Sequence, residues 1–152
     1  MKQSYLSLIL LIERLHRRFL DVIKAELDRM GVEDINNVQT LILYNIGNEN
    51  LTIGELTNRG YYLGSNVSYN IKKLVDNGYL IQERSQHDKR SVKVKLSDKG
   101  LAICSKIDEL YQRNIQDLQR EGLGTQDVDQ LLKYLRALEV FWSKFITGGG
   151  VV

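Results

Sequence analysis

Residues 77–96 read NGYLIQERSQHDKRSVKVKL, in which a helix stop is followed by two strand-like runs. The opening asparagine and glycine are typical of the end of a helix. The runs 80–85 and 92–96 then flank a polar loop, 86–91. In the second run apolar residues alternate with lysines, which is the period of a strand buried on one face. This stretch predicts a β-hairpin directly after a helix.

Two short helices are expected before the hairpin. Thr52 and Glu55 have the spacing of a capping box, so a short helix should begin there. After a glycine-containing turn at 59–64, residues 65–76 place apolar side chains at helical spacing on one face. Two short helices joined by such a turn form a helix-turn-helix pattern. With the hairpin behind it, the pattern predicts a winged helix-turn-helix.

Four further helices complete a mainly α fold class with a small β-hairpin wing and six helices in all. Apolar periodicity predicts helices over 5–30 and 37–46, after Ser97, and after Thr125. The predicted domains are a winged helix-turn-helix DNA-binding domain at 35–100, dimerisation helices at 1–34 and 101–147, and a flexible tail at 148–152. The glycine run at 148–150 is the reason for expecting a tail.

The composition excludes several protein classes. A chain of 152 residues with 43% hydrophobic residues is sized for one compact unit. A single cysteine, Cys104, excludes an internal disulfide and a cysteine-built zinc site, and we interpret it as a buried apolar residue without a redox role. The longest apolar run, 5–12, is too short to span a bilayer. We therefore expect a cytoplasmic protein with no metal, no cofactor, no membrane partner and no catalytic motif.

Charge is unevenly distributed along the chain. The net charge is only +2, but residues 65–99 contain eight basic and four acidic residues. A basic middle indicates one electropositive face, as expected for contact with phosphates, although an ordinary solvated surface is the alternative.

The second helix of a helix-turn-helix presents side chains near its N-terminus to base edges in the major groove. Asparagine can pair with adenine, serine can bond either partner, and lysine can neutralise phosphates. The alternative is a polar helix surface without a partner. The candidate DNA-binding residues on this helix are Ser65, Asn66, Ser68, Tyr69, Asn70, Lys72 and Lys73.

The hairpin supplies a second set of candidate DNA-binding residues. An arginine on a narrow protruding loop can enter the minor groove, and Arg90 is placed for this. Asp88 is expected to pair with Arg90 or Arg84 and set the loop's shape, unless the pair only rigidifies a turn. The candidates in and around the hairpin are Arg84, Asp88, Lys89, Arg90 and Lys93.

The hairpin and its flanks resemble the wing signature of the MarR family of bacterial transcriptional regulators. More loosely, the sequence resembles an alphaproteobacterial branch of that family. The matching residues are Gly78–Leu80, Arg84, Asp88–Val92, Val94, Leu96–Ser97 and Gly100. The resemblance covers nearly the whole chain and implies a homodimer with interlocked terminal helices that binds a pseudo-palindromic site on double-stranded DNA. Tyr69 departs from the family pattern, which commonly has arginine there and reads guanine with it.

The terminal helices independently suggest self-association. Three long helices carry apolar stripes that a small domain cannot easily cover, so a second copy should bury them. The alternative is a monomeric bundle in which the same stripes pack internally.

The resemblance also implies a small-molecule pocket between the dimerisation and DNA-binding parts. Phe19, Thr40 and Tyr44 are the candidate lining residues for a small aromatic effector, with ordinary core packing as the alternative. The predicted function is thus a DNA-binding repressor released by such a ligand. A winged-helix protein-interaction module that does not touch DNA is the alternative function.

Overall fold

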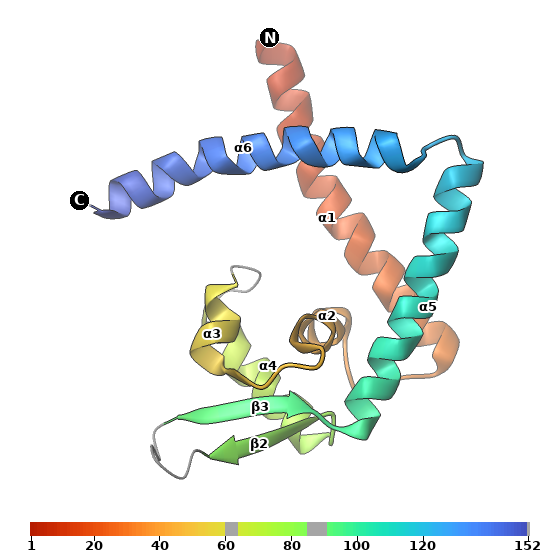
Figure 1. Cartoon of the computed structure of the whole chain (residues 1–152), viewed down its shortest axis with the longest axis vertical. Coiled ribbons are helices and arrows are strands. Elements are labelled where there is room, and N and C mark those ends of the chain that lie inside the picture. Colours follow the sequence, from red (N-terminus) through yellow and green to blue (C-terminus); the bar gives the residue numbers. More distant parts are fainter. Residues whose placement is uncertain (60–63, 85–90, 152) are drawn as a thin grey trace. The chain divides into compact units, whose positions relative to one another are not determined.

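The computed structural model describes residues 1–59, 64–84 and 91–151 (Figure 1). The chain divides into two compact units, Met1–Leu110 and Tyr111–Val152. The described part contains six helices and one three-stranded sheet, which confirms the mainly helical winged fold. The elements are α1 (Lys2–Met30), α2 (Asn37–Ile46), β1 (Leu51–Thr52), α3 (Ile53–Asn58), α4 (Gly64–Asp76), β2 (Leu80–Arg84), β3 (Val92–Leu96), α5 (Asp98–Arg120) and α6 (Thr125–Val151).

The core of the first unit is assembled from several of these elements. Their apolar faces are removed from water together, which is the main source of folding free energy. The end of α1, half of α2 and the inner faces of α4, β3 and α5 are buried. The completely buried apolar side chains are Ile23, Ile42, Leu43, Ile46, Leu56, Val67, Ile71, Leu74, Val94 and Ile107.

The helix ends of this unit follow local chemistry. Gly31 ends α1 with φ +71°, a left-handed conformation that favours glycine. A capping box starts α2, since Asn36 Oδ1 accepts from the backbone N–H of Gln39 and Gln39 Oε1 accepts from the N–H of Asn36. The bounds of α2 agree with the predicted range 37–46.

The sheet is antiparallel in the order β1-β3-β2. In the hairpin, Leu80 faces Leu96 and Arg84 faces Val92, close to the predicted strands. The two-residue strand β1 pairs its Thr52 with Lys93 of β3. Sequence periodicity missed β1 because two residues cannot show a period.

The second unit joins the end of α5 to α6 through a tight turn. Gly122 takes φ +92°, and the backbone N–H of Gly124 donates to the carboxylate of Asp127 in the first turn of α6. On α5, Ile115 and Leu118 have helical apolar spacing but are 49% and 39% exposed within one chain. The helical backbone of α6 continues through 148–150 to Val151, and the flexibility of that segment stays a prediction.

None of the described helices is both long enough and apolar enough to cross a membrane.

Candidate DNA-binding surface

The helix α3 is fixed at both ends. At its start the hydroxyl of Thr52 accepts a hydrogen bond from the backbone N–H of Glu55 over 3.0 Å. This is one of the two bonds of the predicted capping box, and it caps the N-terminus of α3. After its end Arg59 donates to the carbonyl oxygen of Asn45 over 3.0 Å and pairs with the carboxylate of Glu49 at 2.6 Å. These contacts tie the helix that precedes α4 to the end of α2.

The helix α4 has one buried and one exposed face. Val67, Ile71 and Leu74 are completely buried, so they anchor the helix on the core. The exposed face includes five of the predicted DNA-binding residues, and Tyr69 is 60% exposed. The ammonium of Lys73 lies 5.8 Å from the ring centroid of Tyr69, one helical turn away. The exposed candidates on α4 are Asn66, Ser68, Tyr69, Lys72 and Lys73.

Asn70 does not belong to this exposed set. Its side chain is only 8% exposed, and its Oδ1 accepts a hydrogen bond from Gln39 Nε2 over 3.1 Å. This geometry does not support the expectation that Asn70 reads base edges, because its side chain is buried and its carboxamide oxygen bonds Gln39 of α2. The spacing of Asn70 from Val67 and Leu74 already places it on the buried side of α4.

The two lysines of the wing, Lys93 and Lys95, lie in different surroundings. Lys95 forms an ion pair with Glu83 at 2.6 Å, and Asn50 also donates to Glu83. Hydrogen bonds from Lys95 and Asn50 and the charge of Lys95 together lower the pKa of Glu83. Lys93 is exposed and has no ion-pair partner within the described ranges. Of the two, Lys93 is the one whose charge is available to a phosphate.

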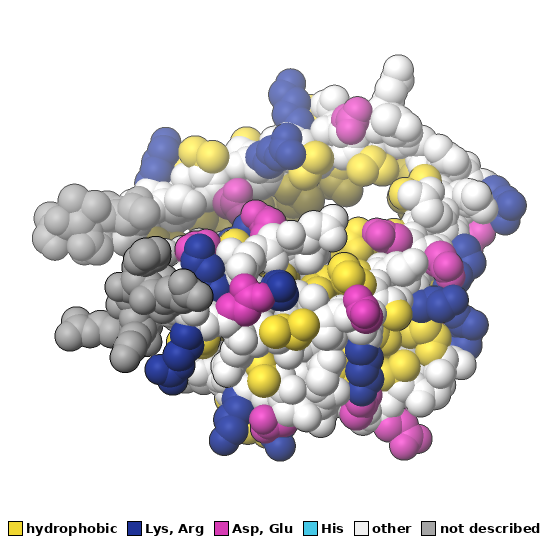
Figure 2. Space-filling model, turned by 60° about the horizontal axis from the view of Figure 1, so that its bottom comes forward, with side chains coloured by type: hydrophobic (Ala, Val, Ile, Leu, Met, Phe, Trp, Pro, Cys, Tyr) yellow, Lys and Arg dark blue, Asp and Glu magenta, His cyan; other side chains and the backbone are white. Residues whose placement is uncertain are grey.

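Several candidates lie where the structure gives no side-chain position. The side chain of Ser65 and residues Asp88, Lys89 and Arg90 are outside the described part of the chain. Arg84, at the end of β2, is described and exposed. On the face shown in Figure 2, Lys and Arg side chains alternate with Asp and Glu side chains. Basic and acidic side chains are thus interspersed on this face.

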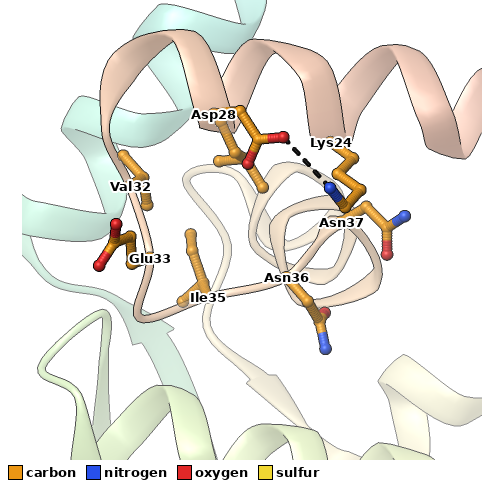
Figure 3. Close-up of a pocket in the computed structure, with 8 residues that line it drawn as sticks. Lys24, Asp28, Val32, Glu33, Ile35, Asn36 and Asn37 are labelled. Carbon is orange, nitrogen blue, oxygen red and sulfur yellow. Dashed lines mark hydrogen bonds and ion pairs between the residues drawn. The ribbon is translucent and has the colours of Figure 1, made fainter.

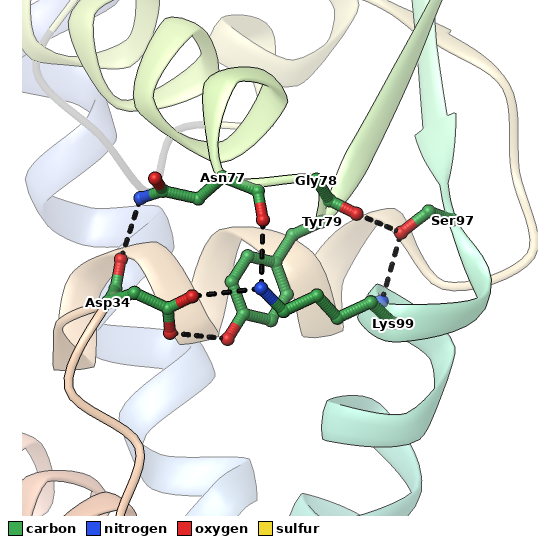
Figure 4. A network of polar contacts seen from close by, with 7 residues as sticks. Asp34, Asn77, Gly78, Tyr79, Ser97 and Lys99 are labelled. Carbon is green, nitrogen blue, oxygen red and sulfur yellow. Dashed lines mark hydrogen bonds and ion pairs between the residues drawn. The ribbon is translucent and has the colours of Figure 1, made fainter.

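A polar network joins the wing to the helices (Figure 4). The carboxylate of Asp34 accepts from the Tyr79 hydroxyl at 2.6 Å and from Lys99 Nζ at 2.9 Å. Lys99 also donates to the carbonyl of Asn77 and lies 4.2 Å from the centroid of the Tyr79 ring. Ser97 donates to the carbonyl of Gly78 at 2.6 Å. The loop before α2, the start of β2 and the start of α5 are held together here.

The electrostatics of this network favour a charged Asp34 and a neutral Tyr79. Burial and the hydrogen bond to Asp34 raise the pKa of Tyr79. For Asp34, slight burial would raise the pKa, but the hydrogen bonds from Tyr79 and Lys99 outweigh it and lower the pKa overall. Asp34 was not predicted as a site residue, because nothing in its sequence neighbourhood indicates a partner 45 residues away.

The predicted effector-pocket residues are not brought together. Thr40 is completely buried, and its hydroxyl donates to the carbonyl of Asn36 over 2.8 Å, so it faces its own helix. Tyr44 lines a pocket of about 380 Å³ and donates to Asp108 at 2.5 Å. Phe19 and Thr40 do not line that pocket, whose remaining residues are Gly47, Asn48, Leu96, Leu101, Cys104 and Ser105.

Cys104 is half-buried beside Asp108. Burial, and then the negative charge of Asp108, raise the pKa of the thiol to about 11. A thiol with so high a pKa is protonated near neutral pH and is a poor nucleophile. No cluster of metal-ligating side chains occurs among the residues that the structure describes.

A second pocket, of about 430 Å³, lies between the end of α1 and the start of α2 (Figure 3). Lys24 and Asp28 form an ion pair at 3.2 Å on its wall. Its apolar lining is Leu27, Val32 and Ile35, and Glu33, Asn36 and Asn37 complete it.

Comparisons with known proteins identify the family. A profile of the MarR family matches residues 33–91. The chain is 37% identical over 139 residues to ExpG, the exopolysaccharide II synthesis transcriptional activator of Rhizobium meliloti, and the match covers 91% of this chain and 72% of ExpG. The chain belongs to the MarR family. As a MarR-family protein it is a transcriptional regulator rather than an enzyme.

Solved structures share the MarR-family fold at low sequence identity. FabT of Streptococcus pneumoniae, solved in complex with DNA, is 18% identical, with 93% of this chain and 99% of that chain covered and a TM-score of 0.74. A cysteine-to-serine mutant of MarR from E. coli, complexed with operator DNA, is 22% identical, with 89% and 95% covered and a TM-score of 0.73. These likenesses show the fold.

Proposed function

We propose that this MarR-family regulator binds a specific, pseudo-palindromic DNA site as a homodimer, with α4 of each copy in a major groove. One observation carries the proposal: α4 presents polar and basic side chains to solvent while Val67, Ile71 and Leu74 fix its other face in the core. The structural neighbours FabT and MarR were both solved with DNA, which supports the same use of the fold.

The chemistry of the α4 surface fits base and phosphate contacts. Asn66, near the start of α4, can pair with adenine through both groups of its carboxamide. Lys72 and Lys73 are exposed further along the helix, where they can neutralise phosphates. In a two-fold dimer the two α4 helices should be about 34 Å apart to meet successive major grooves.

Exposed apolar side chains support the homodimer. On α1, Leu10 is 57% exposed and Leu15 is 53% exposed, and on α6 Leu131 is 57% exposed. Large apolar side chains exposed along a helix of a small protein are typical of an interaction site. A second copy presents the same two surfaces, so a closed symmetric dimer can cover them.

We also propose that the wing contacts the neighbouring minor groove through Arg90. The hairpin strands β2 and β3 carry this loop, and exposed Arg84 and Lys93 flank it. A narrow groove of A·T-rich sequence has enhanced negative potential and attracts an arginine.

The direction of regulation and the effector are the finer parts of the proposal. The sequence predicted a repressor, whereas the relative ExpG is named an activator. A reporter driven by the selected DNA site, with and without the protein, decides the sign. For a small aromatic effector, Tyr44 and its pocket of about 380 Å³ remain the candidate site. The midpoint temperature of thermal unfolding should then rise with a phenolic ligand, because a ligand that binds only the native state stabilises that state.

The central test is selection of DNA from a randomised duplex library by the purified full chain. An enriched motif with two-fold symmetry is expected, and the absence of any enriched motif contradicts the proposal. On the selected duplex, Arg90→Ala should weaken binding by roughly 1–3 kcal/mol at fixed salt. If the affinity for the duplex did not change with salt concentration, the alternative function, a winged-helix protein-interaction module, would be favoured instead.

A further inference from the structure

A buried polar contact connects α2 to the helix proposed to read DNA. Gln39 of α2 and Asn70 of α4 are 7% and 8% exposed, and Gln39 Nε2 donates to Asn70 Oδ1 over 3.1 Å. Around them the buried face of α4 is otherwise apolar. The buried apolar side chains determine which face of α4 meets the core, but apolar contacts are non-directional and tolerate small rotations of the helix. A hydrogen bond between two buried carboxamides is directional and does fix it.

Gln39 is itself held in place on the other side. Its Oε1 accepts from the backbone N–H of Asn36 at 3.0 Å, and its own backbone N–H donates to Asn36 Oδ1 at 2.8 Å. The next residue, Asn37, donates to the carbonyl of Leu20 in α1 over 3.2 Å. The carboxamide of Gln39 is therefore hydrogen-bonded to the N-terminus of α2, and Asn37 in turn hydrogen-bonds that N-terminus to α1.

Asn70 lies on the buried side of α4, next to its exposed face. Asn66 is one turn earlier, at about 40° around the helix axis, and Tyr69 is the preceding residue, at about 100°. A rotation of α4 by about 20° would move side-chain tips on its surface by about 2 Å. That displacement exceeds the range of a good hydrogen bond to a base edge. Whatever fixes the rotation of α4 therefore fixes which bases its exposed side chains can reach.

We propose that Gln39 is a positioning residue for DNA sequence recognition: its hydrogen bond to Asn70 sets the rotation of α4, although neither carboxamide touches DNA. This inference rests on the proposed function of α4. It assigns sequence specificity to the Gln39–Asn70 contact and general affinity to the exposed lysines. Loss of the contact should reduce discrimination between sequences and leave binding to arbitrary duplex DNA unchanged.

The test compares the double variant Gln39→Leu/Asn70→Leu with the matched control Thr40→Val. The double variant replaces both carboxamides, so neither is left buried without the other, and it also removes the Gln39 Oε1 that accepts from the N–H of Asn36. Thr40 is also a buried polar residue of α2, but its hydroxyl donates to the carbonyl of Asn36, and no hydrogen bond joins it to α4 among the residues that the structure describes. Thr40→Val thus reports the effect of altering α2 without altering the link to α4.

Each protein is put through the same selection from randomised duplex DNA. Affinities for the wild-type selected site and for a scrambled duplex are then measured by fluorescence anisotropy at one salt concentration. The double variant should lose about tenfold in the ratio of the two affinities, about the discrimination carried by one good base contact, with scrambled-duplex binding unchanged. Thr40→Val should keep the wild-type ratio.

The inference is overturned if the folded double variant keeps the wild-type motif and ratio, or if Thr40→Val lowers the ratio equally. Should the double variant not fold, Asn70→Ser gives the same readout, because serine is too short to reach Gln39 and the apolar face of α4 is untouched. If the wild-type chain enriches no motif, the proposed function fails and the inference fails with it.

Discussion

The hydroxyl of Tyr79, at the start of the wing, donates a hydrogen bond of 2.6 Å to the carboxylate of Asp34, in the loop before α2. Lys99, from the start of α5, completes the arrangement through its ion pair with Asp34 at 2.9 Å. Three segments that are distant in sequence therefore meet at one carboxylate. Through this junction the wing is fixed relative to α2, α4 and α5, independently of the strand pairing.

Tyr79→Phe removes this hydrogen bond while keeping the ring. We expect the free energy of unfolding at neutral pH to fall by about 1.5–2 kcal/mol, the low part of the range for bonds to charged groups, because Asp34 is partly exposed. Tyr134→Phe is the matched control: Tyr134 is 60% exposed and only accepts a bond from Gln130, so its loss should cost under about 0.5 kcal/mol. Urea denaturation of both variants measures the difference.

The same contact predicts a pH window. The pKa of Asp34 is lowered in the folded state. Its contribution to stability is therefore present at a pH above the ordinary aspartate pKa near 4, and it is lost as the pH falls through the pKa of the folded state. The pKa of Tyr79 is raised, so its contribution is present below about 10 and is lost above that. The stability difference between wild type and Tyr79→Phe should shrink at both ends. If the difference in unfolding free energy between wild type and Tyr79→Phe stayed constant from pH 3 to 11, the Tyr79–Asp34 hydrogen bond would not be the cause of that difference.

Gly100→Ala should destabilise the chain. A Cβ at Gly100 would lie 2.4 Å from the carbonyl oxygen of Tyr79, and backbone cannot move aside as a flexible side chain would. We expect a net loss of about 1–3 kcal/mol, as for other overpacked sites, despite the better helix propensity of alanine. At Gly54, in the first turn of α3, the nearest atom would be Thr52 Oγ1 at 3.8 Å, so Gly54→Ala should be neutral or stabilising. Equal losses in the two variants would refute the steric explanation.

Much of this architecture follows from sequence because its elements carry periodic signals. The strand at 92–96 and the helix at 37–46 were predicted with the bounds that the structure shows. The strand β1 was missed because it is only two residues long. Ile115 and Leu118 have helical apolar spacing but are exposed in one chain, since periodicity indicates that a face is apolar and not what covers it.

The candidate site was predicted less completely, for two physical reasons. Asn70 was grouped with its polar neighbours by residue type, although its spacing from Val67 and Leu74 places it on the buried face. Gln39 was missed, although an asparagine followed three residues later by glutamine is a capping-box signal that the sequence contains. The partner of Gln39 on α4, by contrast, is a long-range contact that local pattern does not reveal.

The two wing lysines should differ in their effect on DNA binding. Lys93→Ala should weaken binding to all duplex sequences alike and lower the slope of log K against log salt by about one, because one phosphate contact is lost. Lys95 is already paired with Glu83 at 2.6 Å, so Lys95→Ala should change the slope much less. Anisotropy titrations at several salt concentrations measure both slopes. Identical slopes for the two variants would show that the Glu83 ion pair does not withhold Lys95 from DNA.

The apolar face of α6 should be required for self-association. Leu131 is 57% exposed in a single chain, so Leu131→Asp should leave folding intact while placing a charge in the proposed dimer interface. Because a two-fold interface contains the substitution twice, we expect the dimer dissociation constant to rise by at least about 100-fold. Gln126→Asp, on an exposed polar position in the first turn of α6, adds the same charge and should leave the dimer unchanged. Sedimentation equilibrium over a concentration series separates these outcomes, and an unchanged dissociation constant for Leu131→Asp would place the interface elsewhere.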